Sequence, residues 1–196
     1  MPENTLPPPG DLQLKYVVLG IGTQNYTCVT SDSSSVPVSI GAIANLYDIG
    51  TRLSNDPLAS YKLPTLSGLA LSLSLFPTQL SWYLSLSGYQ KVLGKHYFSA
   101  DKVPTFSLSN VKPLPFPQAM VTKNDTMNAP KTACPGLKGE GAVLWLKLND
   151  NGFSVGGVNT VYRLETAGGN APKTCDKMAA SFTVPYAAQY WIYGDK

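Results

Sequence analysis

The strongest constraint on the fold is a period of two in the C-terminal quarter of the chain, from Val143 to Tyr193. Three runs in this segment alternate apolar and polar residues, as expected for β-strands, whose successive side chains point to opposite faces of a sheet. Breaks rich in Asn and Gly, at 149–152 and 167–170, separate the runs and suit tight turns. The segment therefore predicts a sheet but indicates no chemistry. The positions that share a face are Leu144, Leu146 and Leu148; Val158, Thr160, Tyr162 and Leu164; and Phe182, Val184, Tyr186, Tyr190 and Ile192.

Short apolar runs with turn residues between them continue through the rest of the chain. Residues 14–29 predict either a hairpin or one bulged strand, because glycines interrupt two apolar-rich runs. Residues 36–47, 95–98 and 104–108 predict further strands.

A block rich in serine and leucine is compatible with two kinds of structure. Strict alternation at 71–75 and 80–87 predicts strands. A short helix at 65–73 stays open, because four apolar residues there also form a helical stripe: Leu66, Leu69, Ala70 and Leu73.

These patterns together predict an all-β protein with antiparallel pairing. Between the two architectures that remain, we favour a two-sheet, jelly-roll-like sandwich, with a closed barrel as the alternative. A chain of 196 residues fits one domain. Residues 1–13, which include three consecutive prolines, predict an extended N-terminal arm, and residues 14–196 a single β domain. Within that domain, residues 110–141 predict a long irregular loop of the kind that is often functional.

Charge is sparse and nearly balanced. Charged residues make up 14% of the chain, against about 25% in an average soluble domain. The 15 basic and 12 acidic residues form no basic run, which argues against nucleic-acid binding. No apolar segment reaches the length of roughly 20 residues that a membrane-spanning helix needs. We expect a monomer without a membrane span.

The cysteines and glycosylation sequons favour an extracellular location. Cys28, Cys134 and Cys175 permit one disulfide and one free thiol, and we favour Cys28–Cys175, with Cys28–Cys134 as the alternative. None of them lies in a Cys-x-x-Cys motif, so no metal site is expected. Asn25 and Asn124 begin Asn-x-Thr sequons, which are used in secreted proteins.

Several blocks of residues carry a resemblance to a known family. They are Leu14 to Gly20, Gly22 to Cys28, Gly94 to Phe98, Trp145 to Leu148, Val161 to Arg163, Thr166 to Gly169, Ala171-Pro172, Cys175 and Val184 to Trp191. On these blocks the chain resembles the family of domain of unknown function 3455 over roughly residues 12 to 193. The resemblance implies a small secreted protein of fungi and bacteria with no assigned reaction. Fungal relatives carry a further cysteine near residues 48–52, which this chain lacks.

Fungal members of that family are often labelled malate dehydrogenase, but the residues argue against this activity. A nicotinamide enzyme shows a Gly-x-Gly-x-x-Gly turn between a strand and a helix. Gly20-Ile21-Gly22 lacks the third glycine and runs into a predicted strand. No cofactor is therefore expected.

His96 is the one candidate catalytic residue. It is the only histidine, so a histidine-rich copper site is excluded, but it could act as a lone general base. This hypothesis of a hydrolase or lyase requires His96 to line a cleft beside Asp101, Glu140 or Tyr162. The alternative is a structural histidine held by hydrogen bonds. Whether the protein is an enzyme stays open.

The leading functional hypothesis rests on aromatic residues. Aromatic rings stack on sugar faces, and the polar edges of Tyr and Trp donate hydrogen bonds. We therefore expect a secreted domain that binds a carbohydrate or other cell-wall component. Its candidate ligand-binding residues are Tyr97, Trp145, Tyr162, Arg163 and Trp191.

Two further expectations each concern two nearby residues of a predicted strand. Arg163 and Glu165 are predicted to form a surface ion pair. At least one of Tyr190 and Trp191 is predicted to be exposed or at an interface, because consecutive side chains of a strand point to opposite faces.

A third functional alternative is a structural or interaction protein that uses its sheet edges.

Overall fold

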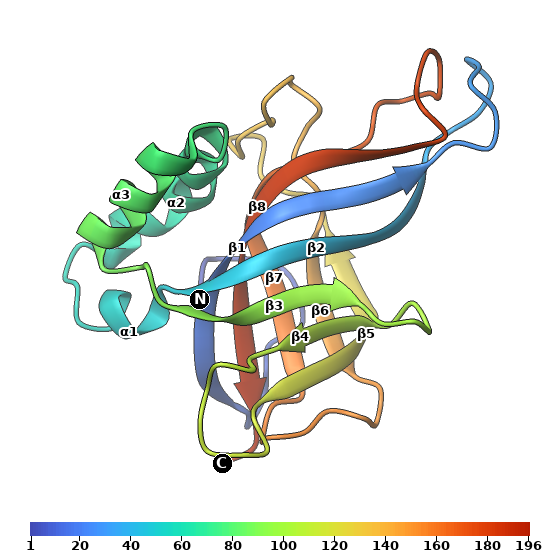
Figure 1. Cartoon of the computed structure of the whole chain (residues 1–196). Coiled ribbons are helices and arrows are strands. Elements are labelled where there is room, and N and C mark those ends of the chain that lie inside the picture. The colour runs from blue at the N-terminus through green and yellow to red at the C-terminus, as the bar shows by residue number, and fades with distance from the viewer.

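The fold is an eight-stranded antiparallel barrel (Figure 1), seen in a computed structural model that describes residues 1–196. Each strand pairs with the next along the chain, and β8 pairs with β1 to close the barrel. The all-β class is confirmed, and of the two predicted architectures the barrel is the one observed, not the sandwich. The strands are β1 Gln13–Thr27, β2 Val38–Asp48, β3 Val92–Phe98, β4 Pro104–Ser107, β5 Gln118–Met127, β6 Trp145–Asp150, β7 Thr160–Gly168 and β8 Ser181–Gly194.

The first and last strands are the longest and decide the closure. β1 and β8 pair in register from Gln13↔Gly194 to Thr27↔Ser181, with one shift near Leu14. β1 is thus one bulged strand rather than a hairpin. β1 is 15 residues long and pairs with β2 on one side and with β8 on the other. The sheet therefore has no free edge along most of β1.

The inside of the barrel is filled by side chains in which small residues face large ones. A Cβ atom on Gly20 would lie 2.5 Å from the Tyr190 ring, so the ring occupies the space that a side chain would need. Ala42, Ala44 and Ala119 are likewise buried in this inner core. This alternation of small and large residues is how small barrels fill their interior.

Three helices lie between β2 and β3: α1 Gly50–Leu53, α2 Ala59–Leu73 and α3 Pro77–Ser87. The strands predicted at 71–75 and 80–87 are therefore wrong, and the helical alternative for 65–73 is confirmed. Pro77 begins α3, and Gly88 ends it in the left-handed conformation with φ of 74°. These two residues are helix start and stop signals. None of the helices is long and apolar enough to span a bilayer.

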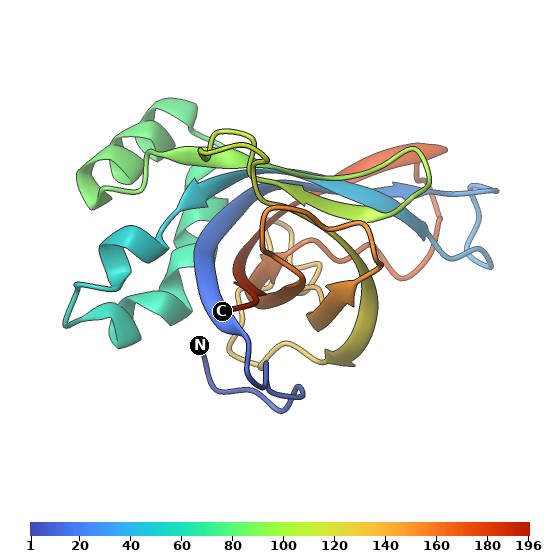
Figure 2. The same cartoon turned by 90° about the horizontal axis from the view of Figure 1, so that it is seen from below.

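The helices cover one side of the barrel (Figure 2) and create a second, outer core. α2 packs against β7 and β8, and the Gln189 side chain donates a hydrogen bond of 2.6 Å to the Leu63 carbonyl. The N-terminal arm adds Leu6 to this core, and its Pro7 carbonyl accepts a bond of 2.7 Å from the Tyr162 hydroxyl. The outer faces of these strands are therefore apolar where the helices and the arm cover them.

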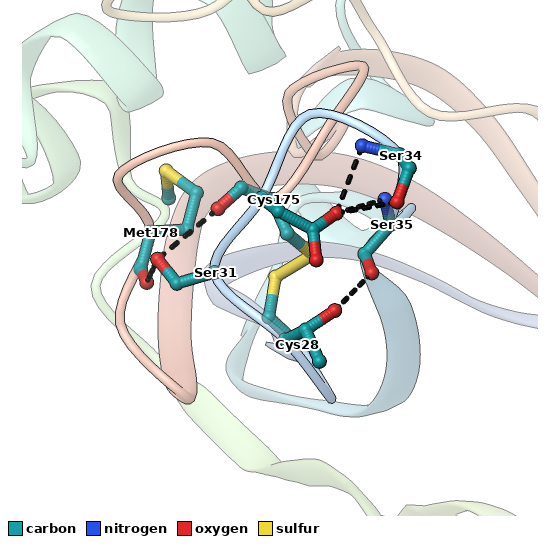
Figure 3. Close-up of a disulfide and its surroundings, with 8 residues drawn as sticks. Cys28, Ser31, Ser34, Ser35, Cys175 and Met178 are labelled. Carbon is teal, nitrogen blue, oxygen red and sulfur yellow. Dashed lines mark hydrogen bonds between the residues drawn. A yellow bond between two sulfur atoms is a disulfide. The ribbon is translucent and has the colours of Figure 1, made fainter.

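A disulfide joins the loop that follows β1 to the loop between β7 and β8 (Figure 3). Cys28 lies just after β1 and Cys175 lies between β7 and β8, with their Cα atoms 5.8 Å apart. The favoured pairing is confirmed, and Cys134 is the free thiol. The Ser31 hydroxyl donates a bond of 2.8 Å to the Met178 carbonyl and so ties the same two loops together.

The segment 110–141 differs from its prediction. It contains the ten-residue strand β5, so the expected long loop is two shorter segments on either side of a strand. The polar sequence of β5 hides the strand, because residues 122–126 are exposed and show no apolar alternation.

Candidate functional site

The predicted aromatic surface is not assembled. Trp145 and Trp191 are only 1% and 6% exposed, and Tyr162 is fully buried, because all three face the outer core under the helices and the arm. Tyr97 is 36% exposed. Tyr190 and Trp191 point to opposite sides of β8, but both are buried, so neither is exposed at the surface. The alternative that one of them lies at an interface stays a prediction.

His96 lies inside the barrel. Its ring stacks on Phe106 with centroids 4.1 Å apart, and its Nδ1 lies 3.0 Å from the Thr105 carbonyl oxygen. Burial lowers the pKa of His96 from 6.5 to about 4, and the charge of Arg163 acts in the same direction. The imidazole is therefore neutral near pH 7.

The surroundings required for a catalytic His96 are not brought together. Tyr162 lies on the outer face of the barrel wall, and Asp101 is exposed in the β3–β4 turn. The Glu140 carboxylate accepts a hydrogen bond of 2.9 Å from the Lys138 backbone N–H in the β5–β6 loop. His96 is only 4% exposed, so its imidazole is not open to a substrate in solution.

Of the predicted site residues, Arg163 and His96 lie on the inner face of the barrel wall. Arg163 lies directly opposite Tyr190 in the β7–β8 pair, and the Tyr190 ring lies 5.6 Å from that of His96. The predicted ion pair between Arg163 and Glu165 is not formed. A register shift follows Leu164, and Glu165 has a φ of 46°, so the strand does not keep the two side chains in simple alternation.

A cleft of about 580 Å³ opens between the start of β1, α1 and the loop that follows β4, and its lining includes Trp191 of the outer core and Leu93 of the inner core. Its helical side is apolar, with Leu53, Ala59 and Leu63. Three lysines also line the cleft: Lys15, Lys91 and Lys112. A cleft of this size with mostly apolar walls and a few polar groups has the character of a small-molecule site.

The charges in this cleft are not balanced. Asp48 is its only acidic residue, and its carboxylate accepts bonds of 3.0 and 2.7 Å from the Thr51 backbone N–H and hydroxyl. The Lys91 ammonium lies 4.0 Å from the same carboxylate. Lys15 and Lys112 form no ion pair anywhere in the protein. The cleft therefore has an excess of positive charge.

Trp191 forms part of the cleft wall and carries an unsatisfied polar group. Its indole N–H is buried and has no hydrogen-bond partner in the protein. Buried donors are nearly always bonded in folded proteins, so such a group calls for an explanation. The arrangement was not predictable from local sequence, because Lys15, Lys91, Lys112 and Trp191 come from four distant segments. Trp191 itself was among the predicted ligand-binding residues, although as part of an exposed surface.

Comparison with known proteins gives a family but no function. No curated protein and no solved structure matches the chain significantly. One family model, described as Protein of unknown function (DUF3455), matches residues 8–194, nearly the whole chain. The chain therefore belongs to the DUF3455 family.

Proposed function

We propose that this protein is an extracellular binding protein that holds a small amphipathic acid in the cleft between β1, α1 and the loop after β4. One observation carries the proposal: an apolar cleft of about 580 Å³ contains two lysines, Lys15 and Lys112, that have no acidic partner. A ligand with an acidic group would supply the missing charge. Its apolar part would contact Leu53, Ala59 and Leu63.

The position of Trp191 supports the same type of ligand. The indole combines a large apolar surface with one donor, and that donor is unpaired. A ligand oxygen is the kind of acceptor that this buried donor lacks. The Cys28–Cys175 disulfide supports secretion, since such bonds persist in oxidising compartments.

Among carbohydrates, only a short acidic sugar fits the proposed cleft. Since Trp145 and Tyr162 are buried, these rings offer no stacking surface to a polysaccharide. A short acidic sugar, such as a uronic-acid oligomer, would still satisfy the lysines of the cleft. We therefore regard acidic sugars and acidic lipids or aromatics as competing ligands of one site on a monomeric protein.

Tryptophan fluorescence provides the test. Three probes are titrated: octanoate, a short galacturonate oligomer, and octanol, which has the apolar chain without the charge. We expect saturable quenching by an acidic probe, weaker binding of octanol, and loss of the signal in Trp191→Phe. No saturable response to any acid would refute the proposal.

Matched charge variants separate the cleft from general electrostatics. The double variant Lys15→Gln/Lys112→Gln removes two charges of the cleft, and the control Lys95→Gln/Lys123→Gln removes two exposed charges outside it. The cleft variant should bind the acid at least several-fold more weakly, and the control should bind it like the unmodified protein. Equal loss in both variants would mean that binding is not at this cleft.

A further inference from the structure

The inner face of the barrel carries a polar cluster that is separate from the cleft between β1, α1 and the loop after β4. Residues that lie directly opposite each other in antiparallel strands point to the same side of the sheet. Gly20 faces inward, against the Tyr190 ring, and Arg163 lies opposite Tyr190. On β1, Gln24 follows Gly20 by four residues and therefore faces inward as well. The lumen thus holds Arg163, Gln24, Tyr186, Tyr190 and His96, contributed by β1, β3, β7 and β8.

Arg163 supplies the only formal positive charge in this cluster. Its Nε and Nη2 groups donate bonds of 3.1 and 2.9 Å to one acceptor, the Leu144 carbonyl, and no carboxylate lies within ion-pair distance. The residue is half-buried. A partly desolvated guanidinium without a carboxylate is an unusual feature, because charges removed from water are normally paired.

The groups around Arg163 are neutral donors. Burial raises the pKa of both Tyr186 and Tyr190, so both stay protonated, and their hydroxyl oxygens lie 2.9 Å apart. His96 is neutral near pH 7 because burial lowers its pKa. The Gln24 side chain is 6% exposed, and its Nε2 donor is buried without a partner.

Gln24 and Arg163 lie near consecutive residues of one segment, Val143 and Leu144. A Cβ atom on Gly169 would lie 3.2 Å from the Gln24 side chain and 3.1 Å from that of Val143. Arg163 bonds to Leu144, the residue after Val143. An unpaired cation and an unpaired amide donor therefore lie beside one short segment at the end of the barrel that carries the disulfide.

We propose that Arg163, with Gln24 as a second donor, binds the carboxylate of a small monoanionic organic acid at the mouth of the barrel. The planar guanidinium has five N–H donors and pairs with a carboxylate in a two-pronged geometry. The single positive charge of Arg163 is matched by the single negative charge of a carboxylate, because the other groups in the lumen are neutral. A dianion such as phosphate or sulfate would lack a second cation. This site lies on the inner face of the wall and is independent of the proposed cleft.

The single histidine provides a reporter for this site. In protein with isotope-labelled histidine, one imidazole signal arises, and it comes from inside the lumen. The probe is acetate at pH 7, exchanged against chloride at constant ionic strength. We expect a saturable shift of the His96 signal, and a weaker response when sulfate replaces acetate. No saturable shift, or tighter binding of sulfate, would overturn the proposal.

Variants locate the binding residue. Arg163→Gln should abolish the shift, and Arg163→Lys should weaken it because the charge remains without the fork. Gln24→Leu should weaken it as well. Lys95→Gln is the matched control, because Lys95 precedes His96 on β3 but is exposed on the outer face. An unchanged shift in a folded Arg163→Gln protein would refute the assignment.

Two more variants distinguish this site from its neighbours. The cleft variant Lys15→Gln/Lys112→Gln should keep the acetate response, which separates failure here from failure of the proposed function. Glu165→Gln should also keep it, since Glu165 forms no ion pair with Arg163. If Glu165→Gln created a response that the unmodified protein lacks, Glu165 would be the true partner of Arg163.

Discussion

At the residue scale, His96 shows how burial changes the properties of a side chain that the sequence marks as reactive. Its position in β3 was predictable, since residues 95–98 read as a strand. Its environment was not, because Phe106 and Tyr190 reach it from other strands. Residues that surround a group in space are set by strand pairing, and strand pairing is not visible in a local pattern.

The buried neutral His96 predicts a loss of stability in mild acid. The pKa of His96 is lowered to about 4 in the folded protein, against 6.5 when unfolded. The unfolded state therefore binds more protons between these values, and the free energy of unfolding falls as the pH decreases from 6.5 to 4. The full loss is about 3 kcal/mol, since one pKa unit corresponds to roughly 1.4 kcal/mol.

Urea unfolding at pH 7, 6, 5 and 4.5 measures this dependence. His96→Phe keeps an aromatic ring against Phe106 and removes the titrating group, so its stability should vary much less over this range. The raised pKa of Glu165 acts in the opposite direction, and the lowered pKa values of Asp56 and Asp150 act in the same direction as His96 at the acid end, so a residual slope remains. An equal slope in both proteins would contradict the prediction.

Gly20 is a second residue whose role only the structure explains. A Cβ atom there would lie 2.5 Å from the fully buried Tyr190 ring. Because the ring cannot move into solvent, Gly20→Ala should lower the free energy of unfolding by about 1–3 kcal/mol. Gly20 does not have a left-handed φ, so the loss measures overpacking and not backbone strain. Thermal unfolding of Gly20→Ala and of the unmodified protein tests the prediction, and equal stability of the two would count against it.

At the element scale, the period of two was right for the barrel strands and wrong for the insertion. In α2 and α3 the serine–leucine alternation coincides with helical spacing, so Leu66, Ala70 and Leu84 are buried on a helix face. Pro77 and Gly88 mark the ends of α3 and could have identified it. Alternation alone does not separate the two structures when serine, which is small and accepts either conformation, fills the polar positions.

The strands also distinguish the two glycosylation sequons. Asn25 is paired on both sides, with Gly41 of β2 and Thr183 of β8, and is half-buried. Asn124 is exposed at a bulge of β5, where β5 pairs with β6 alone. We therefore expect a glycan on Asn124 and none on Asn25.

The prediction is checked by secreting the protein from eukaryotic cells and measuring its mass before and after glycan removal. Asn124→Gln should abolish the mass difference, and Asn25→Gln should leave it unchanged. A glycan that survives in Asn124→Gln would show that Asn25 is used. The matched substitution at Asn149, which lies outside any sequon, controls for effects of the change itself.

At the scale of the whole molecule, one wall of strands separates two cores. β8 contributes Tyr190 and Ile192 to the inner core and Trp191 and Tyr193 to the outer one. This strand contributes to both cores, and it also closes the barrel against β1. We therefore expect the helical insertion and the barrel to unfold as one cooperative unit.

Probes of the two cores should consequently report a single unfolding transition. The fluorescence of Trp145 and Trp191 follows the outer core, and the His96 imidazole signal follows the inner one. Their midpoints in urea should coincide. If the tryptophan signal changed at clearly lower urea, the helices would unfold separately from the barrel. Trp82→Phe removes the exposed tryptophan and makes this comparison cleaner.

The sequence by itself determined the all-β class, the alternation of side chains along β6 and β8, and the family resemblance. Each of these depends on local alternation or on residue identity, which the chain carries directly. The sequence favoured the Cys28–Cys175 bond but did not determine it, because the pairing depends on which loops meet in space. Val158 was expected to share a face with Tyr162, but it lies in the inner core and Tyr162 in the outer one. The tertiary structure alone decided that the sheet closes into a barrel and that helices cover Trp145, Tyr162 and Trp191. It also decided that Lys15, Lys91 and Lys112 share a cleft. These features depend on contacts between distant segments, because closure and burial arise from which strands pair and not from the pattern within any one strand.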